Sequence, residues 1–283
     1  MSETTPVIEL HDVGHNYDGG LQAVRGVSLS IQPAEFIAFV GSNGSGKTTL
    51  IKHFNGLLKP TKGMVRVNGK DTRRATVSQL SRTVGFVFQN PDHQIFAFSV
   101  WEEILFGLNQ QRLPKDEAGD RASRALQTVG LYEKREAHPR ELSRGQRQRL
   151  ATASVLAMET DVLMLDEPTT GQDYTSRRQI MDLAASLHQR GRTIVIITHD
   201  MALVAEYATR AVVMKLGQVI LDSAPADLFA RDDILSATGL KLPPALELAQ
   251  RLRAAGVVIP NHVITLDELC KAIGQGARVK SIT

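Results

Sequence analysis

The sequence contains a single cysteine, Cys270, among its 283 residues. One thiol excludes a disulfide within the chain and a cysteine-rich metal site, and it suits a reducing compartment. Apolar runs of about 18 residues or more are also missing, so no segment predicts a transmembrane helix. The first ten residues carry acidic side chains and no long apolar run, which gives no indication of a signal peptide.

A strong excess of charge of one sign is lacking as well. The chain has 33 Lys and Arg against 30 Asp and Glu, a formal net charge of +3. So small an excess is typical of a solvated surface and does not indicate a nucleic-acid partner. A length of 283 residues with 42% hydrophobic residues fits one large α/β domain with an appendage, or two modest domains.

Short apolar segments predict a sheet. Period-two alternation is typical of half-buried strands, and continuous apolar runs are typical of parallel strands that are covered on both faces. The alternating segments are residues 7–10 and 27–31, and the continuous runs are residues 36–40, 162–165 and 193–197. Residues 211–214 and 218–221 flank Gly217 and predict a hairpin.

Helical spacing of apolar residues predicts four helices in the first two thirds of the chain. They are expected over residues 50–58, where Pro60 forbids continuation, and over residues 101–108, 121–129 and 146–158. From about residue 241 the pattern changes, because Pro243 and Pro244 break the chain before another helical stripe. Thr265 and Glu268 form a capping-box pattern that starts a last short helix. We therefore expect a main domain over residues 1–240 and a small helical extension over residues 241–283.

A glycine-rich loop follows the apolar run of residues 36–40 and fits the P-loop pattern G-x-x-x-x-G-K-[ST]. Its backbone N–H groups and the N-terminus of the following helix suit a phosphate chain. Lys47 is expected to reach the β- and γ-phosphates, and Thr48 to supply a hydroxyl ligand to Mg²⁺. The predicted nucleotide-binding residues are Gly41, Ser42, Asn43, Gly44, Ser45, Gly46, Lys47, Thr48 and Thr49.

Two carboxylates, Asp166 and Glu167, close the apolar run of residues 162–165. An Asp at the end of a strand beside a P-loop can hold Mg²⁺. The next carboxylate, Glu167, is placed to polarise an attacking water as general base. Acidic residues often end buried strands, so this pair gains its meaning from the P-loop.

Leu142, Ser143, Arg144, Gly145 and Gln146 stand just before a predicted helix. This stretch resembles the LSGGQ signature of ABC ATPases, whose Ser and Gly face the nucleotide of the partner subunit. The resemblance implies that Ser143, Gly145 and Gln146 bind ATP across a dimer. The alternative is an ordinary N-cap made by Ser143 at the start of a surface helix.

Other positions also resemble this family, and the resemblance covers about residues 5–240. It implies that Gln89 is the Q-loop residue that senses metal and water, and that His199 is the switch histidine on the γ-phosphate. It further implies that Asp173 is the D-loop aspartate and that Tyr17 stacks on adenine. A lone Tyr is more often a rim or core residue, and the remaining histidines, such as His53, are expected at the surface or in packing.

Two positions depart from the family pattern. Arg144 replaces the first glycine of the signature, and Gln172 stands where Leu is usual in the D-loop. Neither change removes a catalytic group, but both put in doubt how well the signature works across the dimer.

A closer resemblance is to the ATPase subunits of energy-coupling factor transporters, which import vitamins and metal ions. It rests on residues 89–94, on residues 167–174 and on the Pro-rich start and two short helices of residues 242–273. It implies a RecA-like α/β core with an antiparallel β subdomain and a helical subdomain at about residues 90–157. It also implies ATP and Mg²⁺ as ligands and a peripheral position on the cytoplasmic side of the cell membrane.

The implied partners are a second ATPase, identical or paralogous, a transmembrane coupling subunit and a membrane subunit that binds the substrate. We expect the membrane partner to dock in a groove beside Gln89, because residues 95–101 are unusually aromatic for this chain. About half of these rings are expected in the core. The alternative function is a soluble ABC ATPase that acts on a ribosome, DNA or an assembly factor. Such proteins usually carry two cassettes or a coiled-coil insertion, which this chain lacks.

Overall fold

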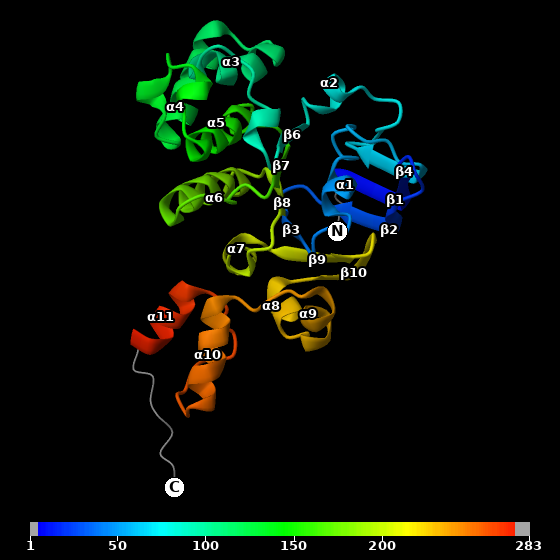
Figure 1. Cartoon of the computed structure of the whole chain (residues 1–283), viewed down its shortest axis with the longest axis vertical. Coiled ribbons are helices and arrows are strands. Elements are labelled where there is room, and N and C mark those ends of the chain that lie inside the picture. Colours follow the sequence, from blue (N-terminus) through cyan, green and yellow to red (C-terminus); the bar gives the residue numbers. More distant parts are fainter. Residues whose placement is uncertain (1–4, 275–283) are drawn as a thin grey trace.

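The computed structural model describes residues 5–274. These residues form two sheets, a group of helices at one end and a pair of helices at the other (Figure 1). Two short segments lie outside the described residues. They are residues 1–4 of the expected main domain and residues 275–283 of the expected extension.

The smaller sheet is antiparallel and has the strand order β2-β1-β4-β5. Strand β1 lies between β2 and β4 and pairs antiparallel with both. The hairpin of β4 and β5 was not expected from the sequence, because glycine and charged side chains interrupt its apolar pattern. The strands are β1 (Ile8–Asn16), β2 (Gln22–Ile31), β4 (Lys62–Val67) and β5 (Lys70–Asp71).

The larger sheet has the order β10-β9-β3-β8-β7-β6 and is parallel except for the edge strand β10. The three continuous apolar runs form β3, β7 and β8, which are buried along their whole length, as predicted. Because these strands are parallel, the residues that follow each of them meet at one edge. The strands are β3 (Phe36–Val40), β6 (Val84–Val87), β7 (Val162–Asp166), β8 (Thr193–Ile197), β9 (Arg210–Lys215) and β10 (Gln218–Ser223).

Two apolar clusters cover the two faces of the larger sheet. One cluster joins it to the antiparallel sheet and to helix α1 (Lys47–Ile51), which follows the glycine-rich loop. The other cluster lies under the helices of the opposite face. These helices are α6 (Tyr174–Gln189), α7 (Met201–Tyr207), α8 (Pro225–Phe229) and α9 (Asp232–Thr238).

Helix α1 is shorter than the sequence predicts. The apolar spacing favoured a helix to residue 58, but α1 ends at Ile51 and tight turns follow. Gly56 has a φ of 74°, a left-handed conformation that ends helical geometry. Phe54 remains fully buried after the turn, whereas Leu57 is exposed. The apolar stripe therefore continued beyond the helix because turn residues also pack into the core.

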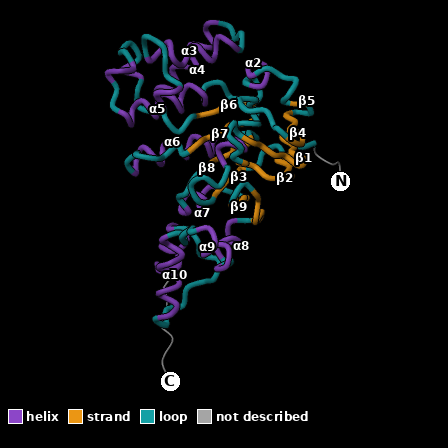
Figure 2. The backbone as a smooth tube through the Cα atoms, turned by 45° about the vertical axis from the view of Figure 1, so that its right-hand side comes forward, coloured by secondary structure: helices purple, strands orange, loops and turns teal. Residues whose placement is uncertain are grey.

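A separate apolar cluster holds the helical subdomain, which lies at the upper end of the molecule (Figures 1 and 2). Helix α4 begins six residues before its predicted start, since its first turns are polar and carry no apolar period. Short 3₁₀ turns at Pro91–His93, Tyr132–Lys134 and Pro139–Glu141 connect this region. Its helices are α3 (Val100–Gln110), α4 (Lys115–Thr128) and α5 (Arg144–Leu156), and α2 (Val77–Leu80) precedes β6.

Helices α10 (Pro244–Ala254) and α11 (Leu266–Gly274) form a small extension with its own apolar cluster. The predicted capping box is present, since Thr265 and Glu268 cap each other through backbone N–H groups. Leu246 of α10 belongs to the main cluster, so packing runs across the expected boundary at residue 240, which stays a prediction. Among the helices of residues 5–274, none has both the length and the apolar character that a bilayer crossing requires.

Candidate nucleotide site

The glycine-rich loop connects β3 to α1, and two of its glycines are required by geometry. Gly41 has a φ of 140°, and a Cβ there would lie 2.2 Å from the carbonyl oxygen of Met214. Gly46 has a φ of 100°, and its Cβ would lie 2.4 Å from the carbonyl oxygen of Ala23. Both contacts are with backbone atoms, so no side chain can be accommodated. The loop is therefore held in its curled form between strand β9 and strand β2.

Lys47, the first residue of α1, is buried against the loop. Its Nζ donates to the carbonyl oxygens of Gly41 (2.8 Å) and Ser42 (2.9 Å) and to the hydroxyl of Ser45 (3.2 Å). Burial lowers the pKa of the Lys47 ammonium from its ordinary value, while the nearby Glu167 carboxylate opposes this shift. The loop thus surrounds one cation with oxygen atoms at the helix N-terminus.

Thr48 and Asp166 meet across the sheet edge. The Thr48 hydroxyl donates to Asp166 Oδ2 at 3.1 Å, and Asp166 is the last residue of the buried strand β7. Burial raises the pKa of the Asp166 carboxyl, and its hydrogen bond with Thr48 acts in the opposite direction. The pair places a hydroxyl and a carboxylate side by side, which is a donor set suited to a hard divalent cation.

Glu167 lies next to Asp166 in an uncommon backbone conformation. Its φ is 49°, in the left-handed region, and its N–H donates to the carbonyl oxygen of Ile197 at the end of β8. Its Oε1 lies 2.9 Å from Nδ1 of His199, and its Oε2 accepts a hydrogen bond from the Thr170 hydroxyl at 3.2 Å. Non-glycine residues in this conformation concentrate at functional sites. The strained turn aims the Glu167 carboxylate at the loop.

A cavity of about 460 Å³ lies between the loop, the end of β7 and the turn after β1. This volume is in the range of small-molecule sites. It brings together most of the residues that the sequence predicts for the nucleotide and the metal. The lining residues are Tyr17, Leu21, Ala23, Asn43, Gly44, Ser45, Gly46, Lys47, Thr48, Thr49, Gln89, Asp166, Glu167 and Ile197.

Tyr17 lies at the side of this cavity, in the turn between β1 and β2. Its ring is 38% exposed, and its hydroxyl lies 3.1 Å from Oγ1 of Thr49. The ring packs edge-on against His15, with 4.7 Å between centroids. A half-exposed aromatic ring at the wall of a polar cavity is suited to stacking on a flat heterocycle.

The signature residues do not line this cavity. Ser143 and Gln146 instead form a reciprocal capping box at the start of α5. Asp173 caps α6, accepting from the N–H of Ser176 at 2.8 Å, and this hydrogen bond lowers the pKa of its carboxyl. A Cβ on Gly145 would lie 3.4 Å from Oε1 of Gln172. Ser143 is therefore the N-cap of α5, which is the alternative role that the sequence left open for it.

The residues that follow Gln89 connect the larger sheet to the helical subdomain through side-chain hydrogen bonds. The Gln94 side chain accepts from the N–H of Phe88 (3.3 Å) and donates to the carbonyl oxygen of Ala151 (2.8 Å). Asp92 is paired with Arg147 of the signature helix at 2.8 Å. Residues 88–94 therefore link the end of β6 with helix α5.

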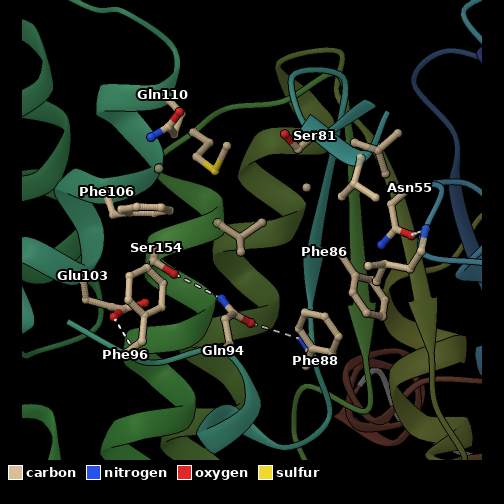
Figure 3. A pocket seen from close by; sticks show the side chains of 17 residues that line it. Asn55, Ser81, Phe86, Phe88, Gln94, Phe96, Glu103, Phe106, Gln110 and Ser154 are labelled. Atoms are coloured by element: carbon tan, nitrogen blue, oxygen red, sulfur yellow. Dashed lines mark hydrogen bonds between the residues drawn. The ribbon is translucent and has the colours of Figure 1, made fainter. Parts of the chain in front are cut away.

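A second hollow, of about 280 Å³, lies between β6 and the helical subdomain (Figure 3). We call it the aromatic groove and define it by Phe86, Phe88, Phe96, Phe106 and Gln94. Phe96 and Phe106 pack edge-to-face with centroids 4.7 Å apart, and both rings remain exposed. Beyond the groove, the Phe98 side chain is 82% exposed. Both phenylalanines of residues 95–101 are thus at the surface, while Trp101 packs on the helical cluster.

Some residues of the site were missed by sequence reasoning. Leu21, Ala23 and Ile197 line the cavity, and Thr170 holds the second oxygen of Glu167. Thr170 could have been found from its spacing, three residues after Glu167 in a turn. The lining role of Leu21 and Ala23 could not, because it depends on how the antiparallel sheet sits beside the loop.

The loop, the buried Lys47 and the two carboxylates at the sheet edge define a P-loop nucleotide-binding protein. A family model described as ABC transporter matches residues 24–170. The chain belongs to this family.

Curated relatives agree with the family. The energy-coupling factor transporter ATP-binding protein EcfA2 of Symbiobacterium thermophilum is 44% identical over 268 residues, which cover 92% of this chain and 93% of the relative. A putative ABC transporter ATP-binding protein of Methanosarcina mazei is 43% identical and covers 94% of this chain. The chain spans 45% of the length of that relative.

Solved structures share the fold. CbiO1 from Clostridium perfringens, part of the ABC transporter complex cbiONQ, aligns with a TM-score of 0.71 at 37% identity and covers 87% of this chain and 99% of its own. A dimeric ATP-binding cassette in a post-hydrolysis state, bound to ADP and Pi, also aligns with a TM-score of 0.71, at 29% identity over 77% of this chain and 98% of its own.

Proposed function

We propose that this chain hydrolyses ATP as one of two nucleotide-binding subunits of an energy-coupling factor type transporter. The observation that carries the proposal is the convergence of Lys47, Thr48, Asp166 and Glu167 on one cavity. The relatives that are named as transporter subunits favour this function over action on a ribosome or on DNA. The chain then works at the cytoplasmic face of a membrane, through a partner that crosses it.

ATP binding begins at the loop. Residues 43–48 line the cavity, and free backbone N–H groups at the N-terminus of α1 attract the phosphates. Lys47 exchanges its carbonyl partners for phosphate oxygens, which are stronger acceptors for an ammonium. The exposed ring of Tyr17 then supports the base at the side of the cavity.

The donor chemistry fits Mg²⁺. Thr48, Gln89 and Asp166 all line the cavity and offer oxygen atoms, the ligands that Mg²⁺ prefers. When bound there with the phosphates, Mg²⁺ supplies positive charge that neutralises the phosphate oxygens. Asp166 is kept beside Thr48 by their hydrogen bond, so the two oxygens need no rearrangement to act together.

Glu167 is the group that accepts a proton from the attacking water. Its carboxylate lines the cavity beside Lys47, and its rotamer is held by His199 and Thr170. A base must be positioned within hydrogen-bond reach of the proton that it removes. His199 is mostly exposed, so it can turn from Glu167 toward a γ-phosphate when a partner closes the site.

The signature turn completes the site of a partner subunit. Ser143 and Arg144 are exposed at the N-terminus of α5, where the first N–H groups of a helix have no partner within the helix. A γ-phosphate presented by a second subunit satisfies these donors. A related cassette is dimeric in a post-hydrolysis state with ADP and Pi bound, which supports this arrangement.

Removal of the divalent cation tests the assignment of Thr48 and Asp166. ATP hydrolysis by the full chain should require Mg²⁺ and should fall to background with excess EDTA. The measurement is phosphate release, with the chain preincubated in EDTA and then given back Mg²⁺ as the control. Hydrolysis that persists in EDTA would remove these residues from the metal role.

The aromatic groove is the proposed docking site of the membrane partner. Exposed Phe96 and Phe106 give it apolar anchors, and such rings contribute most to binding energy at interfaces. Gln94 connects the floor of the groove to both β6 and α5 (Figure 3). A helix of the partner docked there would move with the helical subdomain when ATP closes the dimer.

A charge at the edge of the groove tests this docking. Phe98→Asp should abolish capture of the membrane subunit, because it places an unpaired carboxylate at an apolar interface. ATP binding by the isolated chain should be unchanged, since Phe98 does not line the nucleotide cavity. The measurement is a pull-down, with Leu266→Asp on the exposed surface of α11 as the matched control. Capture that survives Phe98→Asp and Phe96→Asp together would place the partner elsewhere.

A further inference from the structure

A pair of buried histidines lies directly behind Tyr17. His15 is near the end of β1, and His53 follows α1. Their ring centroids are 4.8 Å apart in an edge-to-face arrangement, and Nδ1 of His15 lies 3.1 Å from Nε2 of His53. His53 is fully buried and His15 almost so. Histidines expected at the surface or in packing thus form a polar contact in the core.

The carbonyl oxygens around the two histidines determine which ring nitrogens carry a proton. Nδ1 of His53 lies 3.2 Å from the carbonyl oxygen of Leu50, which can only accept, so His53 carries its proton on Nδ1. In the neutral ring, Nε2 of His53 is then an acceptor and must receive the proton of His15 Nδ1. The same His15 N–H also faces the carbonyl oxygen of Lys59 at 3.1 Å. Burial lowers the pKa of His53 to about 4, which favours the neutral form of its ring.

The chain of contacts continues to the nucleotide cavity. The ring of His15 packs edge-on against Tyr17, with 4.7 Å between centroids and 78° between planes. At its other end the Tyr17 hydroxyl meets the Thr49 hydroxyl at 3.1 Å. Thr49 and Leu50 belong to α1, the helix that starts with Lys47. Tyr17 is therefore held at two points by groups that are attached to the phosphate-binding helix.

We propose that His15 and His53 are positioning residues that fix Tyr17 for the nucleobase, so that base and triphosphate are bound by one rigid unit. This inference rests on the proposed function. A Tyr side chain that is ordered in advance loses less rotamer freedom on binding, which strengthens binding of the base. The histidines themselves touch no ligand and act through Tyr17.

The test separates the contribution of the base to binding from that of the phosphates. It compares two ligands, ATP and inorganic tripolyphosphate, with the full chain and Mg²⁺. His53→Leu removes the bond from His15 to His53 and leaves His15 Nδ1 only the carbonyl oxygen of Lys59. It should weaken ATP binding about fivefold, the effect of one lost hydrogen bond. Tripolyphosphate, which has no base, should bind as it does to the unchanged chain. His53→Gln keeps an amide oxygen as acceptor and should restore ATP affinity. Calorimetry measures the affinity of each variant, and of the unchanged chain, for both ligands.

A second variant keeps the test decisive if His53→Leu does not fold. His15→Phe retains an aromatic ring beside Tyr17 but has no N–H, and it should show the same loss for ATP alone. In a Tyr17→Ala background, neither histidine change should weaken ATP binding further. Equal losses for ATP and tripolyphosphate, or unchanged ATP affinity in both variants, would overturn the proposal. An unchanged chain that binds neither ligand would instead refute the proposed function.

Discussion

The loop end of the nucleotide site and the signature turn differ in how this chain completes them. At the loop, Lys47 and Asp166 are buried, Lys47 is bonded to carbonyl oxygens of its own loop, and Asp166 is bonded to Thr48, which is distant in sequence. At the signature turn, Ser143 and Arg144 are exposed, and Ser143 is paired within its own helix start. Under the proposed function, the first region is a finished half-site and the second is the surface that meets a second subunit. The contrast shows that the phosphate-binding and carboxylate groups converge within this chain, whereas the signature turn does not reach the same cavity.

The largest expected effect is at the finished half-site. Glu167→Gln should lower the rate of ATP hydrolysis about 10²–10⁴-fold, because the amide cannot accept the proton of the attacking water. ATP binding should remain, which single-turnover hydrolysis and calorimetry together would show. Lys47→Ala is the matched control, since it should lose tight ATP binding itself. Near-normal turnover of Glu167→Gln would remove this residue from the role of base.

A smaller effect is expected at the signature turn. Ser143→Ala should lower hydrolysis by the assembled complex about tenfold, the loss of one hydrogen bond to a charged group. ATP binding by the isolated chain should not change, because Ser143 does not line its own cavity. Losing the N-cap should also cost about 1 kcal/mol of stability.

Thr76→Ala is the matched control for that change, because Thr76 and Gln79 form the same capping box on α2. It should cost similar stability and leave hydrolysis unaltered. If both variants lower hydrolysis equally, the effect of Ser143 comes from helix stability and the comparison between the two regions fails.

The last prediction concerns stability at low pH and expects no effect on hydrolysis at neutral pH. His53 has a folded pKa of about 4 against 6.5 unfolded, so the unfolded chain binds more protons between these values. The contribution to stability is present above pH 6.5 and is lost as pH falls toward 4, by up to about 3 kcal/mol. Urea unfolding at several pH values measures it. His53→Gln should flatten the pH dependence over this range, and an unchanged slope would show that other groups cause it.

Much of the loop end could be predicted because its signals are local in sequence. Continuous apolar runs define β3, β7 and β8, and a parallel sheet brings the residues after them to one edge. The early end of α1 could not be predicted, since buried turn residues such as Phe54 keep a helical period without helical backbone. The hairpin of β4 and β5 was hidden by its exposed charged residues.

Contacts between distant segments were beyond sequence reasoning. His15 and His53 meet because β1 and α1 share one core, and no local pattern records that. Sequence reasoning gives no spatial link between the two departures from the family pattern, Arg144 in the signature and Gln172 in the D-loop. The structure instead places Gln172 against Gly145, the neighbour of Arg144. Pairings of this kind depend on the order of strands and helices in space.

The central claim is that two such cassettes together bind two nucleotides, each held by the loop of one subunit and the signature of the other. Native mass spectrometry of the Glu167→Gln chain with ATP and Mg²⁺ tests it most directly, both for the isolated chain and for the complex purified from its native membrane. The account predicts two ATP-binding cassettes with two ATP molecules, the second cassette being identical or a paralogue. A complex of the Glu167→Gln chain that holds ATP with only a single cassette would contradict it.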